Sequence, residues 1–221
     1  MSATRERTAT RHRRKHRRWG WGVLIAAAIL LILGVLAVAP ALRARARLLT
    51  GRDELENARG LLLSGDLGAA SAAFGRAEEA FDEAGGYARS PVLRLAGSVP
   101  LAGRSFDAVV VLADAGRLAA SAGSDLADGI DRLPGGIGEL APASGTIPVE
   151  QIEALHPAIS DARAKLATAL AGVRSLPTSW IVGPVADARD RSIAQLEEAT
   201  GTATAADALA AALPSLVGSQ G

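Results

Sequence analysis

The sequence contains no cysteine, few aromatic residues and only two lysines. The absence of cysteine excludes disulfide bonds, thiolate metal sites and a cysteine nucleophile. Phe, Trp and Tyr together make up 3% of the 221 residues, and Val, Ile and Thr do not form the alternating runs that predict β-strands. Alanine contributes 48 residues and is the strongest helix former. We therefore expect an all-α fold whose core is built from small side chains.

Charge is distributed unevenly along the chain, although the formal net charge is only +1. Residues 1–18 hold eight basic residues and one acidic residue, a net charge of +7. Residues 43–221 hold 16 basic and 22 acidic residues, a net charge of −6, and the residues between these segments carry no charge. This pattern divides the chain into a basic tail (1–21), an apolar segment (22–42) and a mildly acidic body.

The apolar segment Gly22–Leu42 contains 21 uncharged residues. As a helix it would span about 31 Å, which matches a bilayer hydrocarbon core of about 30 Å. Trp19 and Trp21 stand at its start, where aromatic rings favour the headgroup level. A cleaved signal peptide is the alternative, because Ala37-Val38-Ala39 resembles a cleavage site. The run is longer than a usual signal core and Pro40 follows the site, so we predict an uncleaved transmembrane helix.

The flanking charges predict the topology of this helix. Eight basic residues precede it, whereas four follow it closely, at Arg43, Arg45, Arg47 and Arg52. The positive-inside rule then places the N-terminus in the cytoplasm and the body outside a single-pass cell membrane. We expect the basic tail, including His12 and His16, to contact anionic lipid headgroups. No aromatic residue is interleaved with its arginines before Trp19, so we expect no nucleic-acid partner.

The first part of the body, residues 43–86, has the pattern of a helical hairpin. The spacing predicts a helix over 52–63 that ends at Ser64-Gly65, with Asp66 as the N-cap of a second helix. The second helix should stop at Gly85-Gly86. The apolar positions that keep helical spacing on one face are Leu62, Leu63, Leu67, Ala70, Phe74, Ala77 and Phe81. Residues 87–103, which contain Pro91, Pro100 and Gly103, read as a connector.

Residues 104–221 predict an antiparallel bundle or stalk of long, Ala-rich helices, at 104–133, 152–176 and 185–213. The middle helix has a coiled-coil seam with heptad spacing, and Pro157 predicts a kink or a restart near its beginning. The seam consists of Ile152, Leu155, Ile159, Ala162, Leu166, Ala169, Val173 and Leu176. Packing within the chain is favoured over self-association through the seam, because short loops join neighbouring helices. A protein partner on the seam stays open as an alternative.

The polar residues of the body do not form a recognisable catalytic pattern. The sequence has no Gly-x-Ser-x-Gly elbow, no His-Glu-x-x-His zinc helix and no phosphate-binding loop. His156 is the only histidine of the body, beside the seam, and we expect it to be structural or at the surface. Trp180, between Pro177 and Pro184, is expected to plug a loop. We therefore assign no catalytic residue and no cofactor, and we expect a protein that is not an enzyme.

Two groups of carboxylates were considered as metal ligands or charged faces. Asp125, Asp128 and Asp131 are spaced by three residues, but they lack the alternating carboxylates and distal glutamate of a calcium loop. We therefore predict no metal site there. Glu78, Glu79, Asp82 and Glu83 form an acidic cluster on the second hairpin helix, which we interpret as its solvated face.

These features together resemble a known family. The features that carry the resemblance are the basic tail and apolar segment at 11–42, Leu62-Leu63-Ser64-Gly65-Asp66 with Ala70, Phe74 and Ala77, Val99-Pro100-Leu101-Ala102-Gly103, and Leu213-Pro214-Ser215-Leu216-Val217-Gly218. With them the chain is similar to the N-terminal part of membrane-anchored envelope proteins of high-GC Gram-positive bacteria, the domain-of-unknown-function family 4012. It implies that the characteristic domain of the family would begin after Gly221, and it assigns no functional residue to this chain.

Two functions are compatible with this sequence. The first is a membrane-anchored extracytoplasmic scaffold or interaction module of the bacterial cell envelope. The second is the N-terminal part of an envelope enzyme or ligand-binding protein whose working domain lies beyond residue 221. A reading frame that continues past Gly221 would favour the second function, whereas a stop codon there would favour the first function.

Overall fold

The structure, a computed structural model, describes the backbone of residues 15–91, 93, 100–133, 149–177 and 183–217. It describes the side chains of residues 38–91, 93, 105–133, 151–177 and 183–212. The described backbone contains the helices α1 (Lys15–Ser64), α2 (Leu67–Ala88), α4 (Pro100–Asp131), α6 (Val149–Arg174) and α7 (Gly183–Val217), and no strand. The prediction of an all-α fold is confirmed. Residues 1–14, residues 134–148 and Trp180 lie outside the described residues.

Helix α1 is one continuous helix of 50 residues, although the sequence predicted separate helices over 22–42 and 52–63. Pro40 lies inside it, although an interior proline removes one backbone hydrogen bond and its ring crowds the carbonyl four residues earlier. Gly51 does not begin a new helix. It is buried, and a Cβ atom there would meet the Phe81 ring at 3.0 Å, so the glycine admits a close neighbour without breaking α1.

The predicted transmembrane segment Gly22–Leu42 lies within α1. Its first sixteen side chains, residues 22–37, fall outside the described side chains. Among the helices whose side chains are described, none is long and apolar enough to cross a membrane. Insertion of residues 22–42 into a bilayer therefore stays a prediction.

The turn between α1 and α2 forms as the sequence predicts. Gly65 has a φ of +83°, which lies in the left-handed region that glycine adopts without steric cost. Its N–H donates to the Leu62 carbonyl and the N–H of Asp66 donates to the Leu61 carbonyl, which is the hydrogen-bond pattern of a Schellman cap. The Asp66 carboxylate then accepts from the Ala69 N–H at 3.1 Å and caps α2.

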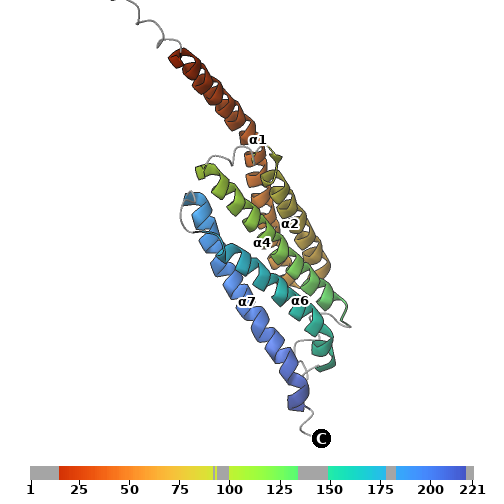
Figure 1. Ribbon diagram of the computed structural model, residues 1–221. Coiled ribbons are helices and arrows are strands. Elements are labelled where there is room, and N and C mark those ends of the chain that lie inside the picture. Colours follow the sequence, from red (N-terminus) through yellow and green to blue (C-terminus); the bar gives the residue numbers. More distant parts are fainter. Residues whose placement is uncertain (1–14, 92, 94–99, 134–148, 178–182, 218–221) are drawn as a thin grey trace, which may run out of the picture.

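The five helices pack in chain order, so that α2 lies between α1 and α4, and α6 lies between α4 and α7 (Figure 1). Phe74 and Phe81 of α2 form two small clusters with α1 and α4. A larger cluster joins α4, α6 and α7 around Leu166, Val173 and Leu196. Helix α4 is therefore central. The buried side chains described for it are all alanines, namely Ala108, Ala113, Ala115, Ala120, Ala122 and Ala127.

Several predicted boundaries and faces are wrong. Helix α2 continues through Gly85-Gly86 to Ala88, and Gly85 is buried, with the Arg89 guanidinium 3.0 Å from where its Cβ atom would lie. Helix α4 begins at Pro100, inside the predicted connector, since proline is well suited to the first helical turn. Helix α6 shows no break at Pro157, and α7 continues past Pro214 to Val217. Leu63 was expected on the packed face of the hairpin but is 80% exposed.

The seam predicted on α6 packs within the chain. Six of its eight residues are buried, namely Leu155, Ala162, Leu166, Ala169, Val173 and Leu176. Most of them belong to the cluster shared with α4 and α7, so these two helices already occupy this face of α6. Any partner of the folded body would need another surface.

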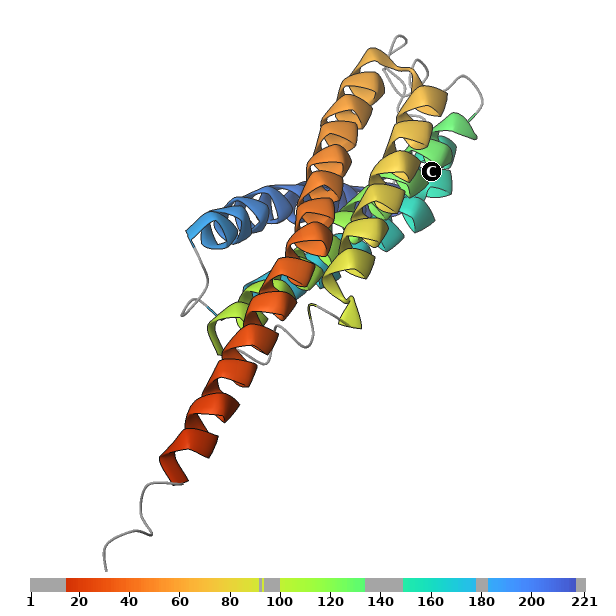
Figure 2. The same ribbon diagram turned by 90° about the horizontal axis from the view of Figure 1, so that it is seen from above.

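The first half of α1 extends beyond the other helices, and the end of α7 lies at the opposite end of the molecule (Figures 1 and 2). Because α2 has only 22 residues, it can accompany only the last part of the 50-residue helix α1. The predicted transmembrane segment lies in the part of α1 that projects, and the packed body begins around Ala44, which is buried.

Candidate functional site

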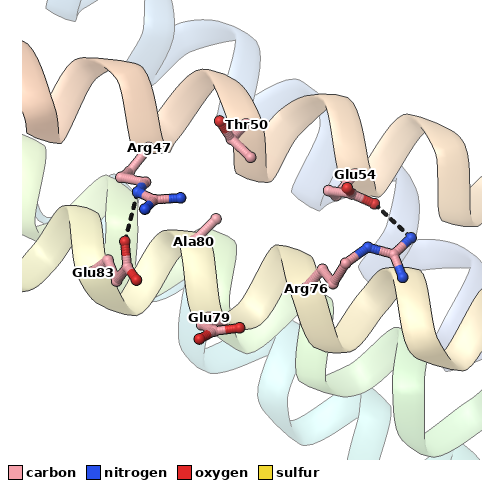
Figure 3. Close-up of a pocket in the computed structure, with 7 residues that line it drawn as sticks. All are labelled: Arg47, Thr50, Glu54, Arg76, Glu79, Ala80 and Glu83. Carbon is pink, nitrogen blue, oxygen red and sulfur yellow. Dashed lines mark hydrogen bonds and ion pairs between the residues drawn. The ribbon is translucent and has the colours of Figure 1, made fainter.

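A charged groove runs between α1 and α2 and has a volume of about 240 Å³. It is lined by Arg47, Thr50, Glu54, Arg76, Glu79, Ala80 and Glu83 (Figure 3). An ion pair closes each end. Arg47 Nε lies 2.5 Å from Glu83 Oε2, and Arg76 Nη2 donates to Glu54 Oε2 at 2.9 Å. Both pairs join α1 to α2, so they hold the hairpin together.

The electrostatics of the groove are dominated by these two pairs. The hydrogen bond from Arg76, aided by its positive charge, holds the pKa of Glu54 below its ordinary value, against the opposing effect of desolvation. The same hydrogen bond raises the pKa of Arg76. The Thr50 hydroxyl donates to the Ala46 carbonyl of its own helix. The groove therefore offers charged groups for binding, but it holds no nucleophile beside a base.

The acidic cluster of α2 is only partly a solvated face. Glu83 pairs with Arg47 of α1, and Glu78 lies 3.6 Å from Arg117 of α4. Glu79 and Asp82 are exposed, and the described part of the chain supplies no ion pair to either. The interpretation of all four as solvent-facing is therefore wrong for Glu78 and Glu83, which connect α2 to its two neighbours.

The three aspartates of α4 do not converge. Asp125 forms an ion pair with Lys165 of α6. Asp128 accepts a hydrogen bond from the Ser71 hydroxyl of α2 at 2.6 Å, and Asp131 is exposed. Because α4 is central, residues three positions apart face different neighbouring helices. No group of three or more His, Cys, Asp or Glu side chains that could hold a metal ion occurs among the described residues.

Among the described residues, Ser121, Asp125 and Lys165 form a second contact, besides Ser71 and Asp128, that brings a hydroxyl next to titratable groups. Lys165 Nζ lies 2.9 Å from Ser121 Oγ and is also bonded to Asp125. The lysine donates to both partners, so it acts as a hydrogen-bond donor and not as a base for the serine. No sequence pattern predicted this contact. Lys165 is the only lysine after Lys15 in a chain with 24 basic residues, and this rarity was the available signal.

His156 lies at the contact between α6 and α7. Its Nε2 atom is 3.3 Å from Asp207 Oδ1, and Arg163 Nε is 3.1 Å from Asp207 Oδ2. These atoms are close enough for ion pairs, although they are not aligned as hydrogen bonds. The expectation that His156 is structural or at the surface agrees with this position, because its side chain is 45% exposed and contacts α7.

Comparison of the chain with family models, with curated proteins and with solved structures gave no match. In the described part of the body, the polar side chains that face one another mostly join neighbouring helices. This arrangement suits a structural or binding surface better than a reaction centre.

Proposed function

We propose that this chain is a single-pass membrane protein whose extracytoplasmic body, an antiparallel bundle of Ala-rich helices, is a scaffold or interaction module of the bacterial cell envelope. The observation that carries the proposal is the uncharged run between a tail of net charge +7 and a body of net charge −6. Helix α1 supports it, because the predicted span and the first helix of the body form one helix without an intervening linker.

A non-catalytic role is supported by how the polar groups of the body are used. Arg47, Arg76, Lys165 and Arg174 each pair with a carboxylate on a neighbouring helix. Such contacts fix the register of helices whose cores are mostly alanine. A body of this kind can present a rigid surface at a set distance from the membrane.

The topology can be tested by cysteine labelling in intact cells, because the chain has no cysteine of its own. Leu63→Cys places a thiol at a side chain that is 80% exposed, in the body. Ser2→Cys places one in the basic tail. A membrane-impermeant maleimide should label Leu63→Cys in intact cells and Ser2→Cys only after permeabilisation. If only Ser2→Cys is labelled in intact cells, the topology is the reverse of the one proposed. If the soluble fraction contains as much of the chain as the membrane fraction, the membrane anchor is contradicted.

The interaction role needs a separate test. A photo-cross-linking amino acid at Leu209, which is 66% exposed, should form covalent products larger than the chain in living cells. The same group at Val173, which is fully buried, is the matched control and should form none. Absence of products at Leu209, Leu63 and Leu49, which are all exposed, would contradict an interaction module.

A further inference from the structure

The arginines that follow the predicted span differ in their partners. Arg47 pairs with Glu83 and Arg52 pairs with Glu56. Arg43 and Arg45 are exposed, and within the described residues neither side chain has an ion pair or a hydrogen bond. This is unexpected in a body with six more acidic than basic residues. Two cations without partners at the start of an acidic body call for a physical explanation.

Of the four arginines that closely follow the predicted span, the two nearest to it are the unpaired ones and the next two are paired, whereas Arg59 further along α1 again has no ion pair among the described residues. At 1.5 Å per residue, Arg43 and Arg45 lie about 1.5 and about 4.5 Å beyond Leu42, and Arg47 lies about 7.5 Å beyond it. The headgroup layer on each side of a bilayer is about 5–7.5 Å thick. A helix α1 perpendicular to the membrane would therefore place Arg43 and Arg45 inside this layer and Arg47 at its outer edge. There the partner of the arginine is a carboxylate of the protein.

The helical geometry directs both side chains away from the bundle. Ala44 is 3% exposed and marks the line along which α1 packs on the body. Adjacent residues of a helix are about 100° apart, so Arg43 and Arg45 project on either side of this line. The apolar side chains just before them, Val38 and Leu42, are 54% and 58% exposed. Along α1, exposed apolar side chains are thus followed by exposed arginines. A lipid monolayer has the matching order, because its apolar acyl chains are followed by its charged phosphates.

We propose that Arg43 and Arg45 bind the phosphate groups of phospholipids in the leaflet that faces the body. A guanidinium group offers a planar pair of N–H donors that matches two phosphate oxygens, and such charge-assisted hydrogen bonds are strong. The contact seats the body on the membrane surface through α1, while the Arg47–Glu83 pair connects the same helix to α2. This inference rests on the proposed membrane anchor. It assigns phospholipid phosphates as the binding partner at the end of the predicted span that adjoins the body.

The test uses the full chain in phospholipid vesicles, with one fluorophore on Ala46→Cys. Ala46 is exposed and lies between the arginines and the groove. A lipid with a nitroxide on its headgroup should quench this fluorophore. The variant R43Q/R45Q should lose at least half of the quenching, because the helix no longer holds to the phosphates. The variant R52Q/R59Q removes the same charge from exposed positions further along α1 and should retain the quenching.

A second label separates failure of this inference from failure of the anchor. A fluorophore on Leu31→Cys, in the middle of the predicted span, should be quenched by a lipid with a nitroxide deep in its acyl chain. If Leu31→Cys is not quenched, the membrane anchor itself is wrong. Two outcomes leave the anchor intact and overturn the phosphate contact. In the first, Leu31→Cys is quenched but Ala46→Cys is not. In the second, the fluorophore on Ala46→Cys is quenched as strongly in R43Q/R45Q as in the parent.

Discussion

The ring of Phe81 in α2 lies so close to Gly116 of α4 that a Cβ atom on residue 116 would come within 2.7 Å of it. The same relationship recurs one heptad away, where the ring of Phe74 lies over Gly123. On its other side, Phe81 meets Gly51 of α1. The two phenylalanine rings of α2 therefore fit against the neighbouring helices because the facing residues are glycines without side chains. This places both phenylalanines of the hairpin at the contact with the central helix.

Gly116→Ala should destabilise the body, because the added methyl group overlaps the Phe81 ring and overpacking costs about 1–3 kcal/mol. Alanine also raises helix propensity by about 1 kcal/mol, so the net effect must be compared with a neutral site. Gly75→Ala in α2 is that control, since no atom lies within 4 Å of its Cβ position. In urea denaturation of the full chain in detergent, Gly116→Ala should be less stable than Gly75→Ala by about 1–3 kcal/mol. Equal stabilities would mean that the ring does not fill this space.

Leu166→Ala should lower the free energy of unfolding by about 2–5 kcal/mol, the range for buried leucine. Leu166 is 8% exposed and packs in the cluster of α4, α6 and α7. Leu209→Ala on α7 removes the same atoms from a side chain that is 66% exposed, and it should change the stability by less than about 0.5 kcal/mol. A small loss for Leu166→Ala would indicate that the seam of α6 is not packed within the chain.

The Asp125–Lys165 contact should show measurable coupling in a double-mutant cycle. Both side chains are partly exposed, at 42% and 31%, so we expect a coupling energy near the upper end of surface pairs, about 1 kcal/mol. The variants are Asp125→Asn, Lys165→Gln and their combination, measured by urea denaturation. The exposed pair Arg52–Glu56 within α1 provides the comparison, with an expected coupling of about 0.3–0.5 kcal/mol. A smaller coupling at Asp125–Lys165 than at Arg52–Glu56 would contradict the α4–α6 contact.

The stability of the hairpin should fall in acid through Glu54. Its pKa in the folded chain is lower than its ordinary value of 4.5, because Arg76 donates a hydrogen bond to it. This contribution is therefore fully present above pH 4.5 and is lost as the pH falls through the lower, folded pKa. The difference in urea midpoint between the parent and Glu54→Gln should shrink between about pH 6 and about pH 3. Glu79→Gln, at an exposed position, should show no such change.

Local signals in the sequence predicted the helices and the first turn well. The Schellman cap at Gly65 and the N-cap at Asp66 depend only on residues within a few positions of one another, so they were readable before the structure. The seam of α6 was also predicted, because heptad spacing is a property of one helix. The glycines were misjudged. Gly85 was predicted to end α2, but the helix continues through it, and the role of Gly51, which makes room for the Phe81 ring, was not predicted.

The candidate site was less predictable than the fold. Arg47, Glu54, Arg76 and Glu83 form the groove only because α1 and α2 are antiparallel and in one register. Asp125 and Asp128 looked like one group in the sequence, but they face α6 and α2. The buried side chains described for α4 are alanines, which also occur at exposed positions of the chain, so the sequence does not single them out. Composition cannot distinguish an alanine in the core from one on the surface.

The sequence by itself determined the all-α class, the division into basic tail, apolar segment and acidic body, and the turn at Ser64–Asp66. These properties depend on composition and on hydrogen bonds between near neighbours in the chain. The tertiary structure decided that α4 is central, that α1 runs without a break into the body, and which carboxylate each arginine meets. Contacts between small residues and between charges depend on the approach of distant helices, because neither alanine nor arginine specifies its partner locally.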